Sequence, residues 1–312
     1  MDWVLFIVGP TASGKSDWAV TLAERWHGVI INCDSRQFYR DVPIGTAWPS
    51  PEAMQRVPHL LYGWLHPDQR PSVGTFIRHA RAAVLNAWAQ GQLPILVGGS
   101  GLYYRGFRFG LHPPPATDPT VRAELEIRAR AEGVEVLYAE LQRLDPQSAA
   151  RIHPHDTRRV IRALEIHYTT GRPASAWRTG WHRPVWPSVA LGLMPPWTHL
   201  RARIIERNRA MWRSGWLDEV IALLEAGTDP AAPVFESIGY RAIAEWWMRG
   251  RPVPETDLLA AIDRATWRLA RRQMQWFRRE RDILWWTTPP TMTEITTWIR
   301  ARLCEMSGAQ YP

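Results

Sequence analysis

A glycine-rich octapeptide near the amino terminus has the residue types and spacing of a phosphate-binding loop. It reads Gly9-Pro10-Thr11-Ala12-Ser13-Gly14-Lys15-Ser16 and matches the pattern G-x-x-x-x-G-K-[ST]. The glycines let the backbone approach a phosphate, so that successive N–H groups point at its oxygens. Lys15 adds a positive charge, and the Ser16 hydroxyl can ligate Mg²⁺. We therefore expect residues 9–16, called the phosphate loop below, to bind a phosphate or diphosphate, with Ser16 as the metal ligand.

The composition supports a special role for Lys15. It is the only lysine of the chain, and all other members of the 38 basic residues are arginine. Arginine presents a planar fork, whereas lysine presents a compact ammonium charge. A chance glycine-rich turn would not explain why this single position keeps the ammonium group.

A second candidate site follows the next apolar run. The strand expected at Val29–Cys33 ends at Asp34-Ser35-Arg36-Gln37. Carboxyl ends of parallel strands meet at one edge of a sheet, where ligands bind. Asp34 is therefore expected to face the same crevice as the phosphate loop. An alternative is that its carboxylate only caps the following turn.

Two further apolar runs, before and after these segments, complete the strands expected around the site. Residues 3–8 precede the phosphate loop, and residues 94–97 precede Gly98-Gly99-Ser100-Gly101, a second place for close backbone approach. No acidic residue closes that strand, so the chain lacks the carboxylate that typical ATP-hydrolysing enzymes place there.

The pattern predicts an α/β fold, with a P-loop NTPase-like parallel sheet flanked by helices and an all-α insertion. Three consecutive prolines at 113–115 form a stiff connector, and residues 120–171 are helical in pattern. We expect a core of residues 1–112 and 186–312, which carries basic carboxy-terminal helices, and an insertion of residues 113–185.

The charge points to a polyanionic partner. The net charge is +8 at pH 7, which exceeds what a small phosphate ester requires. A long helix expected at 255–281 contains Arg264, Arg268, Arg271, Arg272, Gln275 and Arg279, and their spacing places most of them on one stripe. The spacing of Arg158 and Arg162 also puts both on one helix face. A merely solvated surface is the alternative for both groups.

Cysteine usage and hydrophobic patterning suggest a cytoplasmic protein. The chain has 2 cysteines, Cys33 and Cys304, which allow neither a disulfide framework nor a zinc module. The apolar run at the amino terminus is too short for a signal peptide or a membrane span. We expect no membrane association.

Several motifs, in order along the chain, resemble the tRNA dimethylallyltransferase (isopentenyl-tRNA transferase) family. Besides the phosphate loop, the matching segments are Asp34-Ser35-x-Gln37-x-Tyr39, Ile44–Ala47, Pro58-His59, Val97–Tyr103, Arg151–Arg162, Arg203-x-x-x-Arg207-x-x-x-Met211, Gly215, Glu219-Val220, Ile238-Gly239-Tyr240 and Arg271–Arg279. Three residues depart from the usual pattern: Ser100 and Gln275 replace threonines, and Trp48 replaces a lysine. None of these removes a group that the chemistry requires.

The resemblance implies an enzyme that transfers a dimethylallyl group from dimethylallyl diphosphate to N6 of the adenosine 3′ of the anticodon. The implied roles are Asp34 as general base, Ser100 near the reacting centre, and the phosphate loop with Arg207 on the diphosphate, with Mg²⁺ as cofactor. The protein would act as a monomer on the tRNA anticodon stem-loop. The residues implied to contact tRNA are Asp34, Ser35, Arg36, Gln37, Ser100, Arg122, Arg158, Arg159, Arg162, Gly239, Tyr240, Arg241, Arg271, Arg272, Gln273, Trp276, Arg278 and Arg279.

Three alternatives remain open. A small-molecule P-loop kinase would share the phosphate loop but would leave the basic helix unexplained. A non-enzymatic P-loop RNA-binding protein would not need Asp34 opposite the phosphate site or the Ser100 hydroxyl. Within the family, enzymes that prenylate free adenylate use the same donor, but the helical insertion and the basic helix favour tRNA.

Overall fold

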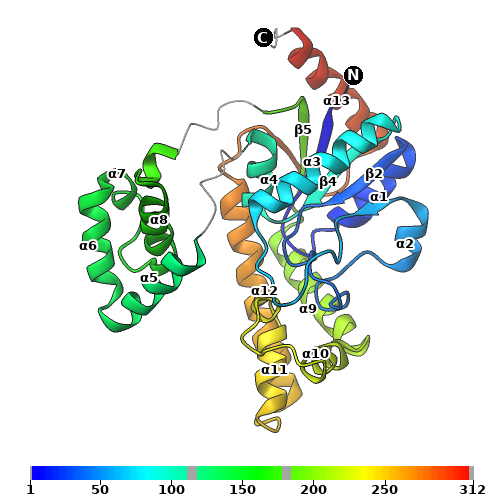
Figure 1. Ribbon diagram of the computed structural model, residues 1–312. Coiled ribbons are helices and arrows are strands. Elements are labelled where there is room, and N and C mark those ends of the chain that lie inside the picture. The colour runs from blue at the N-terminus through cyan, green and yellow to red at the C-terminus, as the bar shows by residue number, and fades with distance from the viewer. Residues whose placement is uncertain (1, 111–117, 178–183, 309–312) are drawn as a thin grey trace. The chain divides into compact units, whose positions relative to one another are not determined.

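The computed structural model describes residues 2–110, 118–177 and 184–308, and contains one parallel β-sheet flanked by helices (Figure 1). The strands are β1 (Val4–Val8), β2 (Gly28–Asn32), β3 (His59–Leu60), β4 (Leu93–Gly98), β5 (Ser188–Leu193) and β6 (Ile283–Trp286). They lie in the order β3-β2-β4-β1-β5-β6, and every pair is parallel. The predicted α/β class is confirmed.

The helices of the sheet-containing part cover both faces and also extend past the carboxyl edge. They are α1 (Lys15–Arg25), α2 (Pro51–Arg56), α3 (Val73–Ala89), α4 (Gly101–Phe109), α9 (Trp197–Arg213), α10 (Trp216–Glu225), α11 (Tyr240–Met248), α12 (Glu255–Phe277) and α13 (Met292–Gly308), with a 3₁₀ turn η2 (Pro233–Glu236). Helices α9 to α12 lie beyond the carboxyl ends of the strands (Figure 1). None of the helices in the described ranges combines the length and hydrophobicity that crossing a bilayer requires.

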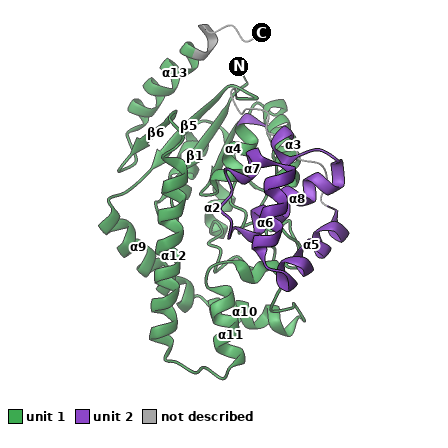
Figure 2. Cartoon of the chain, turned by 90° about the vertical axis from the view of Figure 1, so that its left-hand side faces the viewer, with its two compact units in different colours: residues 1–108, 184–312 green, residues 109–183 purple. Residues whose placement is uncertain are grey.

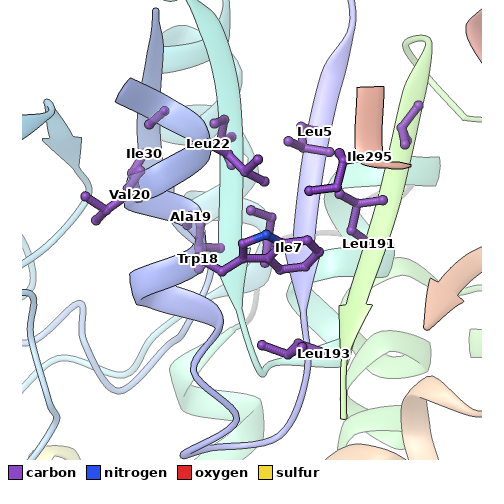
Figure 3. Close-up of a cluster of buried hydrophobic side chains, with 14 of the residues drawn as sticks. Leu5, Ile7, Trp18, Ala19, Val20, Leu22, Ile30, Leu191, Leu193 and Ile295 are labelled. Atoms are coloured by element: carbon purple, nitrogen blue, oxygen red, sulfur yellow. The ribbon is translucent and has the colours of Figure 1, made fainter. Parts of the chain in front are cut away.

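The core forms because β1 is buried on both faces. Leu5 and Ile7 point to one face, where they pack with Trp18 of α1 and Ile295 of α13 (Figure 3). Phe6 points to the other face and meets Tyr104 of α4 edge to face, with ring centroids 5.0 Å apart. A continuous apolar run is the pattern expected for such a doubly covered central strand.

The chain divides into two compact units (Figure 2). Unit 1 comprises residues 1–108 and 184–312, and unit 2 comprises residues 109–183. Unit 2 contains α5 (Pro119–Ala131), α6 (Val134–Leu144), α7 (Pro146–Ala149), α8 (Thr157–Thr170) and a 3₁₀ turn η1 (Ala174–Trp177). The expected boundary at 112/113 and the prolines at 113–115 lie outside the described residues.

Unit 2 has a hydrophobic core of its own. Leu137 and Leu141 of α6 are buried against Val160 and Leu164 of α8. Asp118 caps α5 by accepting a hydrogen bond from the Thr120 N–H at 2.9 Å, which satisfies one of the donors left open at a helix start.

Two elements of unit 1 differ from the sequence-based expectation. Helix α12 ends at Phe277 rather than near residue 281, and the chain then forms the edge strand β6. Helix α4 begins directly at Gly101, the last residue of the segment for which only a close backbone approach was expected. Strand β6 and helix α4 are short, and aromatic contacts such as Phe277–Trp285 and Phe6–Tyr104 stabilise them; local propensity does not reveal such contacts.

A glycine substitution tests the close packing of β2 against β4. A Cβ added at Gly98 would lie 2.2 Å from the Cys33 carbonyl oxygen, so backbone must move. We expect Gly98→Ala to lower the free energy of unfolding by about 1–3 kcal/mol. In contrast, Gly74→Ala in α3 meets only Ser72 Oγ at 3.8 Å and should stabilise by about 0.4–1 kcal/mol. Denaturant unfolding of both variants checks this, and equal stabilities would contradict it.

Candidate active site

The phosphate loop connects β1 directly to the start of α1. Gly14 precedes the helix with φ +90°, a conformation that favours glycine. At Gly9, an added Cβ would lie 2.5 Å from the Leu193 carbonyl oxygen of β5. The loop therefore packs closely against the end of β5 at Gly9 and leads directly into α1. The positive, amino-terminal end of α1 faces the space above the loop.

Three cationic side chains surround the loop. Lys15 Nζ donates to the Pro10 carbonyl oxygen at 3.4 Å. From α9, Arg207 Nη2 donates to Thr11 Oγ1 at 2.6 Å, and Arg203 Nη1 donates to the Ser13 carbonyl oxygen at 3.2 Å. The pKa of Lys15 is lowered to about 8, chiefly by burial; the nearby Asp34 charge opposes this shift and the Arg207 charge adds to it. Burial also lowers the pKa of Arg207.

Helix α12 holds the loop from another side. Gln273 is buried, and its Oε1 accepts a hydrogen bond from the Thr11 N–H at 2.8 Å. A Cβ added at Gly99 would lie 2.3 Å from Gln273 Nε2, and one at Gly101 would lie 2.1 Å from Trp276 Cε3. Gln273 and Trp276, both expected to contact tRNA, thus pack against the two glycine-rich loops of the site.

Asp34 lies at the carboxyl end of β2, as expected, and its backbone is held by the preceding buried asparagine. The Asp34 N–H donates to Asn32 Oδ1 at 2.8 Å, and Asn32 Nδ2 donates to the Leu61 carbonyl oxygen at 3.0 Å. Asp34 Oδ1 accepts from the Arg36 N–H at 3.1 Å. The carboxylate therefore both closes the turn and lines the cleft described next; the two interpretations do not exclude each other.

A cleft of about 1050 Å³ lies above the phosphate loop. Among the residues that line it are Thr11–Asp17, Asp34, Gln37, Thr46–Trp48, Val97, Gly98, Arg203, Glu206, Arg207 and Thr287–Met292. The Asp34 charge opposes the lowering of the pKa values of Lys15 and Arg207, as expected for a carboxylate that lines the same cleft. The cleft thus brings the cationic phosphate loop together with the Asp34 carboxylate, which could accept a proton.

Ser100 is not part of this lining. Within the described residues, the cleft reaches Val97 and Gly98 of β4 and stops before Ser100. The Ser100 carbonyl oxygen accepts the Tyr103 and Tyr104 N–H groups at 3.1 and 3.0 Å, so this residue starts α4. The hydroxyl at this position is half-buried.

The residues implied to contact tRNA fall into exposed and internal groups. The exposed ones on unit 1 are Arg241, Arg271, Arg272, Arg278 and Arg279. Tyr240 is buried and its hydroxyl donates to Glu219 Oε1 at 2.5 Å, and Gly239 faces the Trp216 ring. Ser35 and Arg36 are half-buried, and Arg36 Nη1 donates to the Pro233 carbonyl oxygen at 3.5 Å.

On unit 2, the basic residues divide in the same way. Arg158 and Arg159 are exposed on α8. Arg162 Nη1 lies 2.9 Å and Arg122 Nη1 3.9 Å from Oε2 of the fully buried Glu165. These two arginines balance a buried negative charge within the unit.

Two groups of site residues escaped the sequence interpretation. Arg203 was noted only as part of a motif, although its four-residue spacing from Arg207 puts both on one face of α9. Glu206 and the loop Thr287–Met292 also line the cleft, and nothing local distinguishes them. In the described ranges, no cluster of three or more histidine, cysteine or acidic side chains could hold a metal ion.

The family model "IPP transferase" matches residues 37–280. The chain belongs to the IPP transferase family. A tRNA dimethylallyltransferase of Geobacter sulfurreducens is 40% identical over 297 residues, covering 94% of each chain. One of Halorhodospira halophila is 43% identical over 286 residues, covering 89% of this chain and 91% of the relative. The family and enzyme class expected from the motifs are confirmed.

Solved structures agree with this assignment. A tRNA isopentenylpyrophosphate transferase from Bacillus halodurans superposes with a TM-score of 0.72 at 33% identity, covering 99% of each chain. A eukaryotic dimethylallyltransferase, determined acting on tRNA, gives a TM-score of 0.80 at 25% identity and covers 91% of this chain and 73% of its own.

The lowered pKa of Lys15 predicts how diphosphate binding depends on pH. Below about pH 8 the free enzyme carries the ammonium charge, and above it a proton must be taken up on binding. Affinity for inorganic pyrophosphate should therefore fall as pH rises through 8, by up to about tenfold per pH unit. The affinity ratio of wild type to Lys15→Met cancels the titration of pyrophosphate itself. Calorimetry should show this ratio shrinking above pH 8; a constant ratio from pH 6 to 10 would contradict the role of Lys15.

Proposed function

We propose that the protein transfers a dimethylallyl group from dimethylallyl diphosphate to N6 of the adenosine 3′-adjacent to the anticodon of tRNA, and releases pyrophosphate. It would act in the cytoplasm, as a monomer on the anticodon stem-loop, with Mg²⁺. The observation that carries this proposal is the cleft, in which Asp34 shares one space with the phosphate loop, Lys15 and Arg207. The names of the relatives support the two substrates.

The phosphate loop suits the diphosphate of the donor. Its backbone, Lys15 and Arg207 offer donors and positive charge to oxygens that become more negative as the C1–O bond breaks. Two cations already held beside the loop need little rearrangement at the transition state. No water has to be aligned for phosphoryl transfer, which agrees with the absence of an acidic residue after Val97.

The Ser16 position fits a Mg²⁺ ion. Ser16 is exposed at the start of α1 and lines the cleft beside Lys15. Because the described residues hold no acidic cluster for a metal, the remaining ligands would be diphosphate oxygens and water, which Mg²⁺ prefers. When bound, such an ion neutralises charge on the leaving diphosphate.

Asp34 fits the role of general base. The N6 amine is a weak nucleophile because its lone pair is delocalised into the purine. As N6 bonds to C1 of the allyl group and the C1–O bond breaks, one N6 proton must leave, and the Asp34 carboxylate accepts it. The target adenosine would have to leave the stacked anticodon loop to reach this cleft.

The exposed arginines of α12 provide a surface for the RNA backbone. Arg264, Arg268, Arg271, Arg272, Arg278 and Arg279 are all exposed on or just after this helix. The buried Gln273 and the half-buried Trp276 of the same helix touch the loops of the active site. We therefore assign tRNA contact on α12 to the arginines, and assign Gln273 to the support of the phosphate loop. On unit 2, Arg158 and Arg159 are the candidates for RNA contact.

The decisive experiment measures transfer of radiolabelled dimethylallyl diphosphate to unmodified tRNA with Mg²⁺, with AMP as the competing acceptor. Label should appear in tRNA at the anticodon-adjacent adenosine. Asp34→Asn should reduce the single-turnover rate by about 10²–10⁴-fold while pyrophosphate still binds, because a negative charge near Lys15 is removed. The exposed Asp41→Asn serves as control. Label in AMP alone would reject the tRNA acceptor, and a normal rate in Asp34→Asn would reject the base.

The basic face of α12 predicts a salt dependence. Each arginine that contacts a phosphate contributes about 1 to the slope of log affinity against log salt concentration. Arg272→Gln with Arg279→Gln should therefore weaken tRNA binding and lower the slope by about 2, whereas Arg300→Gln on α13 should change neither. Filter binding across a salt series checks this; an unchanged slope in the double variant would exclude that surface.

A further inference from the structure

Glu219 in the first turn of α10 makes three hydrogen bonds that the proposed chemistry does not use. Its Oε2 accepts from the Ile44 N–H at 2.7 Å, and its Oε1 accepts from the Gly45 N–H at 3.0 Å and from the Tyr240 hydroxyl at 2.5 Å. Burial raises the pKa of Glu219, whereas the three donors favour its charged form. A carboxylate that accepts three bonds is held in one orientation.

The two backbone donors belong to a compact loop, Val42–Trp48, called the wall loop below. Thr46, Ala47 and Trp48 of this loop line the cleft. Internal bonds close it: Thr46 Oγ1 donates to the Val42 carbonyl oxygen at 2.6 Å, and the Trp48 N–H to that of Pro43 at 2.9 Å. Ala47 has φ +56°, a conformation that is costly for a residue with a Cβ. The loop therefore needs support from outside.

The wall loop in turn holds Gln37. Gln37 Nε2 donates to the carbonyl oxygens of Thr46 at 3.0 Å and Ala47 at 2.6 Å. Because both amide hydrogens are directed at the loop, the side-chain oxygen of Gln37 is the atom left for the cleft, which Gln37 lines together with Asp34. Glu219 is thus linked to the cleft by two successive sets of hydrogen bonds: the first joins Glu219 to the wall loop, and the second joins the wall loop to Gln37.

The packing around Glu219 leaves the wall loop little freedom. Trp216, one turn earlier on α10, is fully buried between Gly45 and Gly239. A Cβ at Gly45 would lie 1.9 Å from Trp216 Nε1, and one at Gly239 would lie 2.1 Å from Trp216 Cζ2. Tyr240 also lies within 3.2 Å of the Val42 carbonyl oxygen through its hydroxyl.

The phosphate loop is supported by different residues. Arg203 and Arg207 of α9 and Gln273 of α12 contact it, and none of these bonds involves Glu219 or the wall loop. The two sides of the cleft can therefore be disturbed separately, which makes a positional role for Glu219 measurable.

We propose that Glu219 is a positioning residue for the acceptor side of the cleft, which anchors the wall loop so that Gln37 and Asp34 meet the target base in register. Tyr240 acts with it as a buried partner rather than as an RNA contact. This inference rests on the proposed function, because it assigns the wall loop to the acceptor.

The test replaces one carboxylate oxygen by a donor. In Glu219→Gln, the new NH₂ group must face either the Ile44 or the Gly45 N–H, so one bond is replaced by a donor–donor contact. We expect the single-turnover rate at saturating tRNA to fall by about 10–10²-fold, with the Kd for pyrophosphate within about twofold of wild type, as expected if uncoupled sites act independently. Asp218→Asn, exposed on the same turn, makes the same charge change and should leave both values unchanged.

A structural readout and a milder variant complete the experiment. Hydrogen exchange of the Ile44 and Gly45 amides should accelerate in Glu219→Gln, while exchange in α1 stays unchanged. Tyr240→Phe removes one donor without changing charge and should give a smaller fall in rate, so the proposal stays testable if Glu219→Gln does not fold.

Two results would overturn the proposal. A normal rate in both variants would show that the wall loop does not need Glu219. A parallel loss of rate, pyrophosphate affinity and thermal stability in both would show only a general structural role. If wild-type enzyme prenylates no tRNA although pyrophosphate binds, the proposed function itself fails, and the exchange data then report anchoring alone.

Discussion

Two half-buried cations, Lys15 and Arg207, lie beside one loop, and this constraint shapes the rest of the active site. Burial lowers the pKa of both Lys15 and Arg207, and the Arg207 charge adds to the lowering for Lys15. Asp34, at the carboxyl end of β2, offsets part of this effect on both groups. A diphosphate would complete the neutralisation. The unliganded protein thus keeps two positive charges in an electrostatically unfavourable position, where they are already placed to bind an anion. Preorganised sites have this property.

Holding that charge in place requires support from helices far along the chain. Arg203 and Arg207 reach the phosphate loop from α9, and Gln273 reaches it from α12. The two helices are tied to each other, since Asn208 Nδ2 donates to Asp263 Oδ1 at 2.8 Å. The helices beyond the carboxyl edge of the sheet therefore do more than supply a basic surface. They brace the loop that binds the leaving group.

Several glycines at the site allow large side chains to pack directly against the backbone. Gly45 and Gly239 receive Trp216, Gly101 receives Trp276, and Gly99 receives Gln273. Each contact joins elements that are distant in sequence and brings a side chain close to backbone, which any Cβ would prevent. These contacts account for part of the high tryptophan content, because a large rigid ring fills the space beside a glycine with little loss of conformational entropy.

The amino-acid sequence by itself determined the parallel sheet, the phosphate loop and the position of Asp34. Buried strands appear as continuous apolar runs, the loop is a short local motif, and strand ends of a parallel sheet converge on one edge. Each of these signals lies within about ten residues. The arginine-rich stripe of α12 could also be predicted from the sequence, because helical periodicity places most of these residues on one face.

Only the tertiary structure decided which side chains turn inward. Gln273 and Tyr240 lie within basic or family-like motifs, yet both are buried. Gln273 is hydrogen-bonded to Thr11, 262 positions away in the sequence, and Tyr240 to Glu219, 21 positions away. Ser100 begins a helix outside the lining of the cleft, and Glu219 gains its partners from a loop about 175 residues earlier. Such contacts depend on how whole elements pack. A local pattern shows which face of a helix is polar, but not which distant backbone groups that face will meet.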